Sequence, residues 1–167
     1  MSRAFVKEPD GEAGPERLPD LPQSAHPNHV TPRGLRRLEE RQGQLQESLR
    51  LLRAGTDDMA TRVERARLER DLRWVAARIE RAIVVDPAGQ PRDRVTFGAT
   101  VEVAEEDGTT REYTIVGEDE ADAGRGLVSW VSPLARALLD AAVGDEVTWH
   151  RPSGDRELTI RKIRYEG

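Results

Sequence analysis

The chain has 167 residues, no cysteine and a formal net charge of −5, with 31 acidic side chains against 26 basic ones. Without cysteine it cannot form disulfides, thiolate metal sites or cysteine nucleophiles, and the acidic balance argues against holding nucleic acid by bulk attraction. No run approaches the roughly 18 apolar residues of a membrane span, and the start lacks the apolar core of a secretion signal. We therefore expect a cytoplasmic protein without a membrane partner.

Residues 1–30 are predicted to form a flexible tail. Apolar residues are few in this stretch, so it buries too little surface to offset the entropy of ordering the chain. Its prolines are Pro9, Pro15, Pro19, Pro22 and Pro27.

Residues 31–84 are predicted to form an antiparallel helical hairpin, a coiled coil. Thr31 before Pro32 is a helix start signal, and leucines then recur with heptad spacing at Leu35, Leu38, Leu45, Leu49 and Leu52. The pattern breaks at residues 54–56. A second apolar stripe with helical period follows at Leu68, Leu72, Val75, Ile79 and Ile83. We expect Met59, Val63 and Ala66, which precede this stripe in another phase, to pack in the core; the alternative is that they face a partner.

Residues 85–93 have the composition of a linker. Residues 94–167 are predicted to form a largely antiparallel sheet with one helix, so the fold class is α+β. Apolar residues alternate from Val95 and Phe97 onward, as in strands, and Ser132-Pro133 opens a helix over residues 134–142, with Gly144 beyond its end. We expect the acidic residues Glu118–Glu120 to form a solvated turn, with a contact surface as the alternative, and the tryptophans (Trp74, Trp130 and Trp149) to pack in the interior or along the helix pair.

Charge is distributed unevenly along the chain. Residues 31–84 carry 13 arginines and nine acids, a net +4, whereas residues 93–167 carry nine bases and 16 acids, a net −7. Such asymmetry can orient a protein on a large charged partner. It is equally typical of a helical arm whose arginines and glutamates only keep it soluble.

Several strings resemble the Gre family of transcription elongation factors. They are VTPRGLRRLEE, VTFGATVEV, YTIVGEDEAD, SPLARALLDAAVGDEV and TIRKIRYEG, in that order, from Val30 to Gly167. The resemblance implies an N-terminal coiled coil that enters the secondary channel of bacterial RNA polymerase and a C-terminal FKBP-like domain that docks at its rim. It implies a regulator of elongation that is no enzyme by itself, has no cofactor of its own, and meets nucleic acid only through the polymerase complex.

The resemblance also suggests a metal-supporting role for the bend between the helices. Cleavage-stimulating members present acidic side chains there, which help the polymerase hold Mg²⁺ while backtracked RNA is hydrolysed. Here the bend reads AGTDDMATR, so Asp57 and Asp58 are the candidate ligands. Two alternatives stay open: both acids sit at the positive N-terminus of the second helix with Thr56 as cap, or Thr61 and Glu64 form a capping box.

The second candidate site is the start of the C-terminal helix. By resemblance, Ser132, Pro133, Leu134 and Arg136 would contact a coiled coil of a large polymerase subunit, although Val131 stands where relatives often have Asp or Asn. The alternative is that Ser132 and Pro133 only start the helix while Leu134 fills the core.

A different class of function is an FKBP-like binding or isomerase module with a helical adaptor. Such an enzyme needs an aromatic-lined apolar pocket. The chain has seven aromatic residues in all, three Trp, two Tyr and two Phe, which supplies such a pocket poorly.

Overall fold

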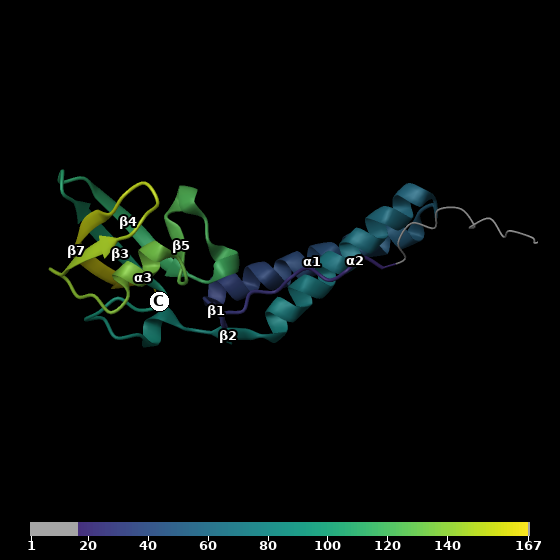
Figure 1. Cartoon of the computed structure of the whole chain (residues 1–167). Coiled ribbons are helices and arrows are strands. Elements are labelled where there is room, and N and C mark those ends of the chain that lie inside the picture. Colours follow the sequence, from purple (N-terminus) through teal and green to yellow (C-terminus); the bar gives the residue numbers. More distant parts are fainter. Residues whose placement is uncertain (1–16, 167) are drawn as a thin grey trace, which may run out of the picture. The chain divides into compact units, whose positions relative to one another are not determined.

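The computed structural model describes residues 17–166, and these residues divide into two units. Residues 17–23 pack with residues 40–77, and residues 24–39 pack with residues 78–166. Two long helices and a sheet domain with one further α-helix (Figure 1) confirm the predicted α+β class. The predicted domain boundaries stay predictions, because each long helix runs through both units.

The two long helices are α1 (Pro32–Ala54) and α2 (Met59–Glu80). α1 starts where expected, since the Thr31 hydroxyl accepts a hydrogen bond from the Gly34 backbone N–H at 2.9 Å. The helix ends at Ala54, within residues 54–56, where the interruption of the leucine pattern predicted its end. No helix within residues 17–166 combines the length and the apolar character that a bilayer crossing requires.

The first unit buries part of both predicted apolar stripes. Leu45 and Leu49 of α1 are almost fully buried, as is Val75 of α2. Ile83, which we expected to continue the second stripe, lies beyond the end of α2 and is 47% exposed. Met59 and Val63, which we expected in the core, are instead about half exposed, at 48% and 50%. They lie in the first two turns of α2, out of phase with the stripe that follows, so only Ala66 of the three is buried.

Residues 17–23 differ from the predicted flexible tail, because they make specific polar contacts with α2. The Arg73 guanidinium binds the Asp20 carboxylate at 2.6 Å and the Leu18 carbonyl at 2.8 Å, and the Trp74 indole donates to the Pro22 carbonyl at 3.2 Å. These bonds need no apolar core, and proline lowers the entropy that ordering costs. Residues 24–30 also differ from a flexible tail, because Ser24 and the His26 backbone make hydrogen bonds and Asn28–Val30 form a strand. The remaining part of the tail prediction, residues 1–16, lies outside the described residues.

The second unit contains both sheets of the described chain. β1 (Asn28–Val30) pairs in parallel with β2 (Ala82–Val84). The larger sheet has the strand order β5-β4-β3-β7-β6, formed by β3 (Ala99–Glu105), β4 (Thr110–Val116), β5 (Leu127–Ser129), β6 (Glu146–Trp149) and β7 (Arg156–Tyr165). Its pairs are antiparallel except β4 with β5, so the sheet is largely antiparallel, as predicted.

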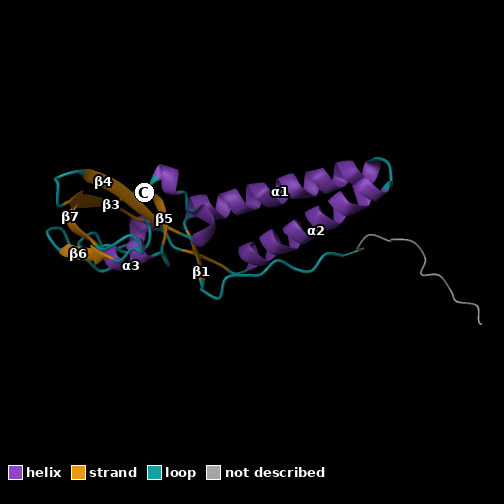
Figure 2. Ribbon diagram, turned by 45° about the horizontal axis from the view of Figure 1, so that its top comes forward, coloured by secondary structure: helices purple, strands orange, loops and turns teal. Residues whose placement is uncertain are grey.

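The short helix α3 (Pro133–Leu138) packs on one face of this sheet (Figure 2) and completes its core. The core is made of Val95, Ala99, Val101, Val103, Ile115, Leu134, Ala135, Leu138, Ala141, Leu158 and Ile160. Val95 does not belong to a strand as expected: its N–H donates to the Ala141 carbonyl and its own carbonyl accepts from the Asp140 N–H, both at 2.8 Å. These bonds, with Asp140 at a positive φ of 66°, end α3 earlier than residue 142.

Gly117, just after β4, has no room for a side chain. A Cβ at this position would overlap the carbonyl oxygen of His29 in β1, so the chain must shift to accept alanine. We expect Gly117→Ala to lower the free energy of unfolding by about 1–3 kcal/mol, measured by urea denaturation. Gly43→Ala is the control: a Cβ there meets nothing within 4 Å, and helix propensity predicts a gain of up to about 1 kcal/mol. Equal effects of the two substitutions would contradict the close packing of Gly117.

Candidate functional site

The acidic residues Glu118–Glu120 form a short 3-10 helix, η2, and bind the start of α1. The Glu120 carboxylate, 3% exposed, accepts from the Arg33 guanidinium at 2.7 Å and from the Thr31 hydroxyl at 2.5 Å. The same hydroxyl caps α1, so one buried carboxylate fixes both the cap and the first turn. All of these residues belong to the second unit.

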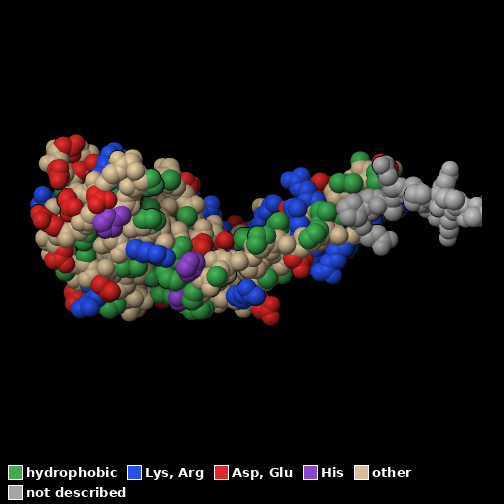
Figure 3. Space-filling model, viewed as in Figure 1, with side chains coloured by type: hydrophobic (Ala, Val, Ile, Leu, Met, Phe, Trp, Pro, Cys, Tyr) green, Lys and Arg blue, Asp and Glu red, His purple; other side chains and the backbone are tan. Residues whose placement is uncertain are grey.

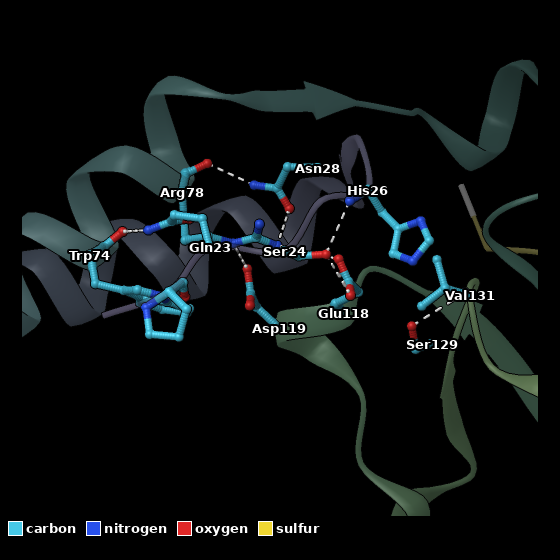
Figure 4. A network of polar contacts seen from close by, with 11 residues as sticks. Gln23, Ser24, His26, Asn28, Trp74, Arg78, Glu118, Asp119, Ser129 and Val131 are labelled. Carbon is cyan, nitrogen blue, oxygen red and sulfur yellow. Dashed lines mark hydrogen bonds and ion pairs between the residues drawn. The ribbon is translucent and has the colours of Figure 1, made fainter. Parts of the chain in front are cut away.

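Arg78, in the last turn of α2, is held by the same acidic segment. Its side chain is 2% exposed and donates to the Asp119 carboxylate at 2.7 Å and to the Asn28 side-chain oxygen at 2.5 Å. Glu118 lies 3.9 Å from the guanidinium and accepts a hydrogen bond from the Ser24 hydroxyl. Figure 4 shows these side chains converging on Arg78 from two other stretches of the chain.

We call this group the root cluster; it comprises Asn28, Thr31, Arg33, Arg78, Glu118, Asp119 and Glu120. It corrects the expectation that Glu118–Glu120 form a solvated turn, because their carboxylates pair with Arg33 and Arg78 rather than with water. Sequence reasoning missed Arg78. The signal was its place between Val75 and Ile79 on the apolar side of α2, where an arginine must find partners.

We expect Asp119→Ala to destabilise the second unit by about 2–3 kcal/mol, because it removes a close partner of a buried guanidinium. Urea denaturation followed by circular dichroism measures the change. Glu47→Ala is the control, since it breaks an exposed ion pair with Arg50 inside α1. Exposed ion pairs contribute little to the free energy of unfolding. If Glu47→Ala lowered this free energy as much as Asp119→Ala does, the pairing of Asp119 with the buried Arg78 would not be what stabilises the unit.

The bend between α1 and α2 holds the two candidate metal ligands, and each has a local structural role. Asp57 pairs with Arg62 at 3.0 Å and Arg65 at 3.2 Å. The hydrogen bond and attraction from Arg62 lower the pKa of Asp57 below its usual value. Asp58 caps α2, because its carboxylate accepts the Thr61 backbone N–H at 2.8 Å.

Asp57 and Asp58 lie at the N-terminus of α2, as one of the two alternatives predicted, but the capping residue differs from both. The cap of α2 is Asp58, while Thr56 donates its hydroxyl to Asp58 at 3.3 Å. Thr61 is the residue that the cap binds, so it does not start a capping box with Glu64. The Thr61 backbone N–H is the main cause that lowers the pKa of Asp58.

The bend is a poor fit to a magnesium-supporting site. Mg²⁺ prefers oxygen ligands in octahedral geometry, and here Asp57 is paired with two arginines while Asp58 is hydrogen-bonded to the end of α2. Within residues 17–166 no three His, Asp or Glu side chains are grouped to hold a metal.

The Asp58 cap should depend on a side-chain oxygen that accepts the Thr61 N–H, with a further contribution from the carboxylate charge. We expect Asp58→Ala to speed hydrogen exchange of the Thr61 amide, whereas Asp58→Ser, which can still cap, should protect it. Because the folded-state pKa lies below 3.8, the contribution of the charge is present at neutral pH and is lost as the pH falls below about that value. Equal Thr61 exchange in Asp58→Ala and the unchanged protein would contradict the cap.

At the start of α3, Ser132 and Pro133 begin the helix, as one alternative predicted. Fewer of the four predicted docking residues are therefore exposed to a partner. The Ser132 hydroxyl accepts the Ala135 N–H at 3.2 Å, and Pro133 occupies the first turn. Leu134 is 4% exposed and lies in the core, so its side chain does not face a partner. Pro133 and Arg136 are exposed, and these two residues are what remains of the predicted docking site.

Two further expectations concern the tryptophans and the uneven distribution of charge. Trp130 and Trp149 are half-buried against the sheet core, and Trp74 is a half-buried residue of α2. On the face shown in Figure 3, acidic side chains gather over the sheet domain and arginines along the hairpin, which follows the uneven charge of the sequence.

Two clefts in residues 24–166 bear on the isomerase alternative. One, of about 370 Å³, is lined by the first turns of α1 together with Thr100, Thr114 and Glu120. The other, of about 270 Å³, lies at the turns between β3 and β4 and between β6 and β7, where its lining is almost wholly acidic. Neither has an aromatic side chain in its lining, so neither favours a proline isomerase.

Comparison with known proteins identifies the family. The C-terminal family model of the transcription elongation factors GreA and GreB matches residues 90–165. GreB of Neisseria meningitidis serogroup B is 42% identical over 99 residues, which are 59% of this chain and 61% of that protein. GreA of Alkalilimnicola ehrlichii is 41% identical over 116 residues, which are 68% of this chain and 73% of that protein.

The chain therefore belongs to the GreA/GreB family of transcription elongation factors. It spans about three fifths of the length of the GreB relative that it matches. Among solved structures, a GreA/GreB factor from Nitrosomonas europaea is 25% identical and covers 82% of this chain and 98% of its own, with a TM-score of 0.41.

Proposed function

We propose that this chain binds bacterial RNA polymerase at its secondary channel and regulates elongation. The observation that carries the proposal is the family match over residues 90–165, which includes the exposed Pro133 and Arg136 at the start of α3. In this proposal the sheet domain docks through that surface, the helical hairpin enters the channel, and the protein acts in the cytoplasm, where the polymerase works. It needs no cofactor of its own.

We further propose that the chain acts by occupying the channel rather than by supporting RNA cleavage. Two facts favour occupancy. The carboxylates at the bend are already engaged by Arg62, Arg65 and the end of α2, and the bend contains no third acid. A hairpin with this bend can block access to the polymerase active site without contributing a ligand there.

Binding is tested by titrating fluorescently labelled protein with core RNA polymerase. We expect Arg136→Ala to weaken binding roughly tenfold, because exposed arginines at the centre of an interface often dominate its energy. Arg161→Ala is the matched control, because it removes another exposed arginine, on β7 and away from the start of α3 in the sequence. Failure of the unchanged protein to bind would refute the proposal.

Occupancy is tested in stalled elongation complexes. We expect the protein to slow nucleotide addition in proportion to its concentration without shortening the transcript. The double variant Asp57→Ala, Asp58→Ser removes both carboxylates and keeps a capping residue, and it should inhibit as strongly as the unchanged protein. Transcript cleavage that disappears in this variant would show instead that the bend supports catalysis.

A further inference from the structure

Four rings from separate stretches of the second unit form a cluster beside the start of α3. His29 lies 5.0 Å from Trp130, centroid to centroid, and 6.0 Å from Phe97, while His26 lies 6.0 Å from Trp130. Both imidazoles meet the indole edge-on, at 78° and 75°. We call these residues, His26, His29, Phe97 and Trp130, the ring cluster.

Two polar atoms in this cluster are buried without a hydrogen-bond partner. They are the indole nitrogen of Trp130 and the Nδ1 atom of His29. Most buried polar groups in folded proteins are paired, and an unpaired donor costs free energy. Both residues are fixed by their backbones, because His29 is part of β1 and the Trp130 N–H donates to the Val116 carbonyl at 2.9 Å.

The ring cluster is continuous with the proposed docking surface. Trp130 precedes Ser132 by two residues, and the apolar Val131 between them offers a partner no polar side chain. Figure 4 shows the His26 ring directed toward Val131. The His26 side chain is exposed, and its backbone N–H donates to the Ser24 hydroxyl at 3.2 Å.

We propose that the polymerase-binding surface is composite, with His26 and Trp130 joining Pro133 and Arg136. The Trp130 indole N–H donates to a carbonyl or carboxylate oxygen of the polymerase. The exposed His26 ring moves off the indole to let that oxygen approach, and then packs against the polymerase surface beside it. The partner is thus a surface rich in acceptor oxygens, which suits the positive charge of Arg136. This inference rests on the proposed function, because it assigns further contacts to the same docking site.

Binding supplies the Trp130 indole N–H with an acceptor that it lacks in the free protein. A donor already paired in the free state would exchange one hydrogen bond for another and gain little. An unpaired donor gains the whole bond, so this indole should contribute more to affinity than an ordinary surface group. Trp130 is then a residue whose N–H matters for binding and not for folding.

The experiment compares four variants of the full chain in the same titration with core RNA polymerase. Trp130→Phe removes the N–H, and His26→Ala removes the exposed ring. Trp149→Phe and His150→Ala are matched controls elsewhere on the sheet domain, where Trp149 is half-buried and His150 is exposed. We expect at least fivefold weaker binding for the first two variants and unchanged binding for the controls.

Stability of each variant is measured in parallel by thermal unfolding. Trp130→Phe and Trp149→Phe lose the same side-chain volume, so a shared fall in stability is a volume effect, and the affinity difference between them isolates the N–H. If Trp130→Phe and His26→Ala bind as tightly as the unchanged protein while Arg136→Ala binds weakly, the composite surface is wrong and the proposed function stands. If the unchanged protein does not bind, the proposed function itself fails.

Discussion

The burial of one guanidinium, that of Arg78, constrains the rest of the second unit. A positive charge that is 2% exposed is tolerated only with close partners, and here they come from β1 through Asn28 and from η2 through Asp119. The next acid, Glu120, binds Thr31 and Arg33 at the start of α1. Three consecutive carboxylates therefore set where one helix begins and where the other ends.

This arrangement explains why the helix ends pack with the sheet domain and not with the hairpin. Residues 24–39 and 78–80 belong to the same unit as the sheet, and the root cluster supplies the pairing that groups them. Buried ionic groups are weak evidence for stability when compared with apolar replacements, yet they can define a single register. If the ends of α1 and α2 were shifted by one residue relative to η2, the bonds from Arg78 to Asp119 and from Arg33 to Glu120 would be lost.

Local patterns in the sequence predicted local structure well. Heptad leucines and the break near Gly55 predicted α1, Ser132-Pro133 predicted the start of α3, and alternation predicted the sheet. Two of the errors share one physical cause, which is pairing over long separations. Arg78 and Asp119 are 41 residues apart, and Thr31 and Glu120 are 89 apart. No local pattern reveals such partners, so the acidic segment looked like a solvated turn and the proline-rich segment like a tail. The other errors are local: Met59 and Val63 lie out of phase with the buried stripe, and the cap of α2 is Asp58 where neighbouring residues were named.

The sequence predicted where the candidate site residues lie, but it did not predict what their side chains contact. The sequence placed Asp57, Asp58 and Ser132 at helix starts, where a side chain either caps the helix or faces a partner, and the choice depends on distances that only the structure supplies. Asp58 and Ser132 cap their helices, and Leu134 is in the core. What the sequence could not indicate was the ring cluster, because it joins residues from both ends of the chain.

The segment that precedes α1 links the root cluster to the ring cluster beside the start of α3. Its Ser24 hydroxyl donates to Glu118 of the root cluster and accepts the backbone N–H of His26, whose ring packs against Trp130. A stretch that composition alone marks as unstructured thus positions a ring next to the start of α3. Because these bonds are polar and largely made by side chains of a few residues, small changes in this segment can alter the surface beside the start of α3 without disturbing the sheet core.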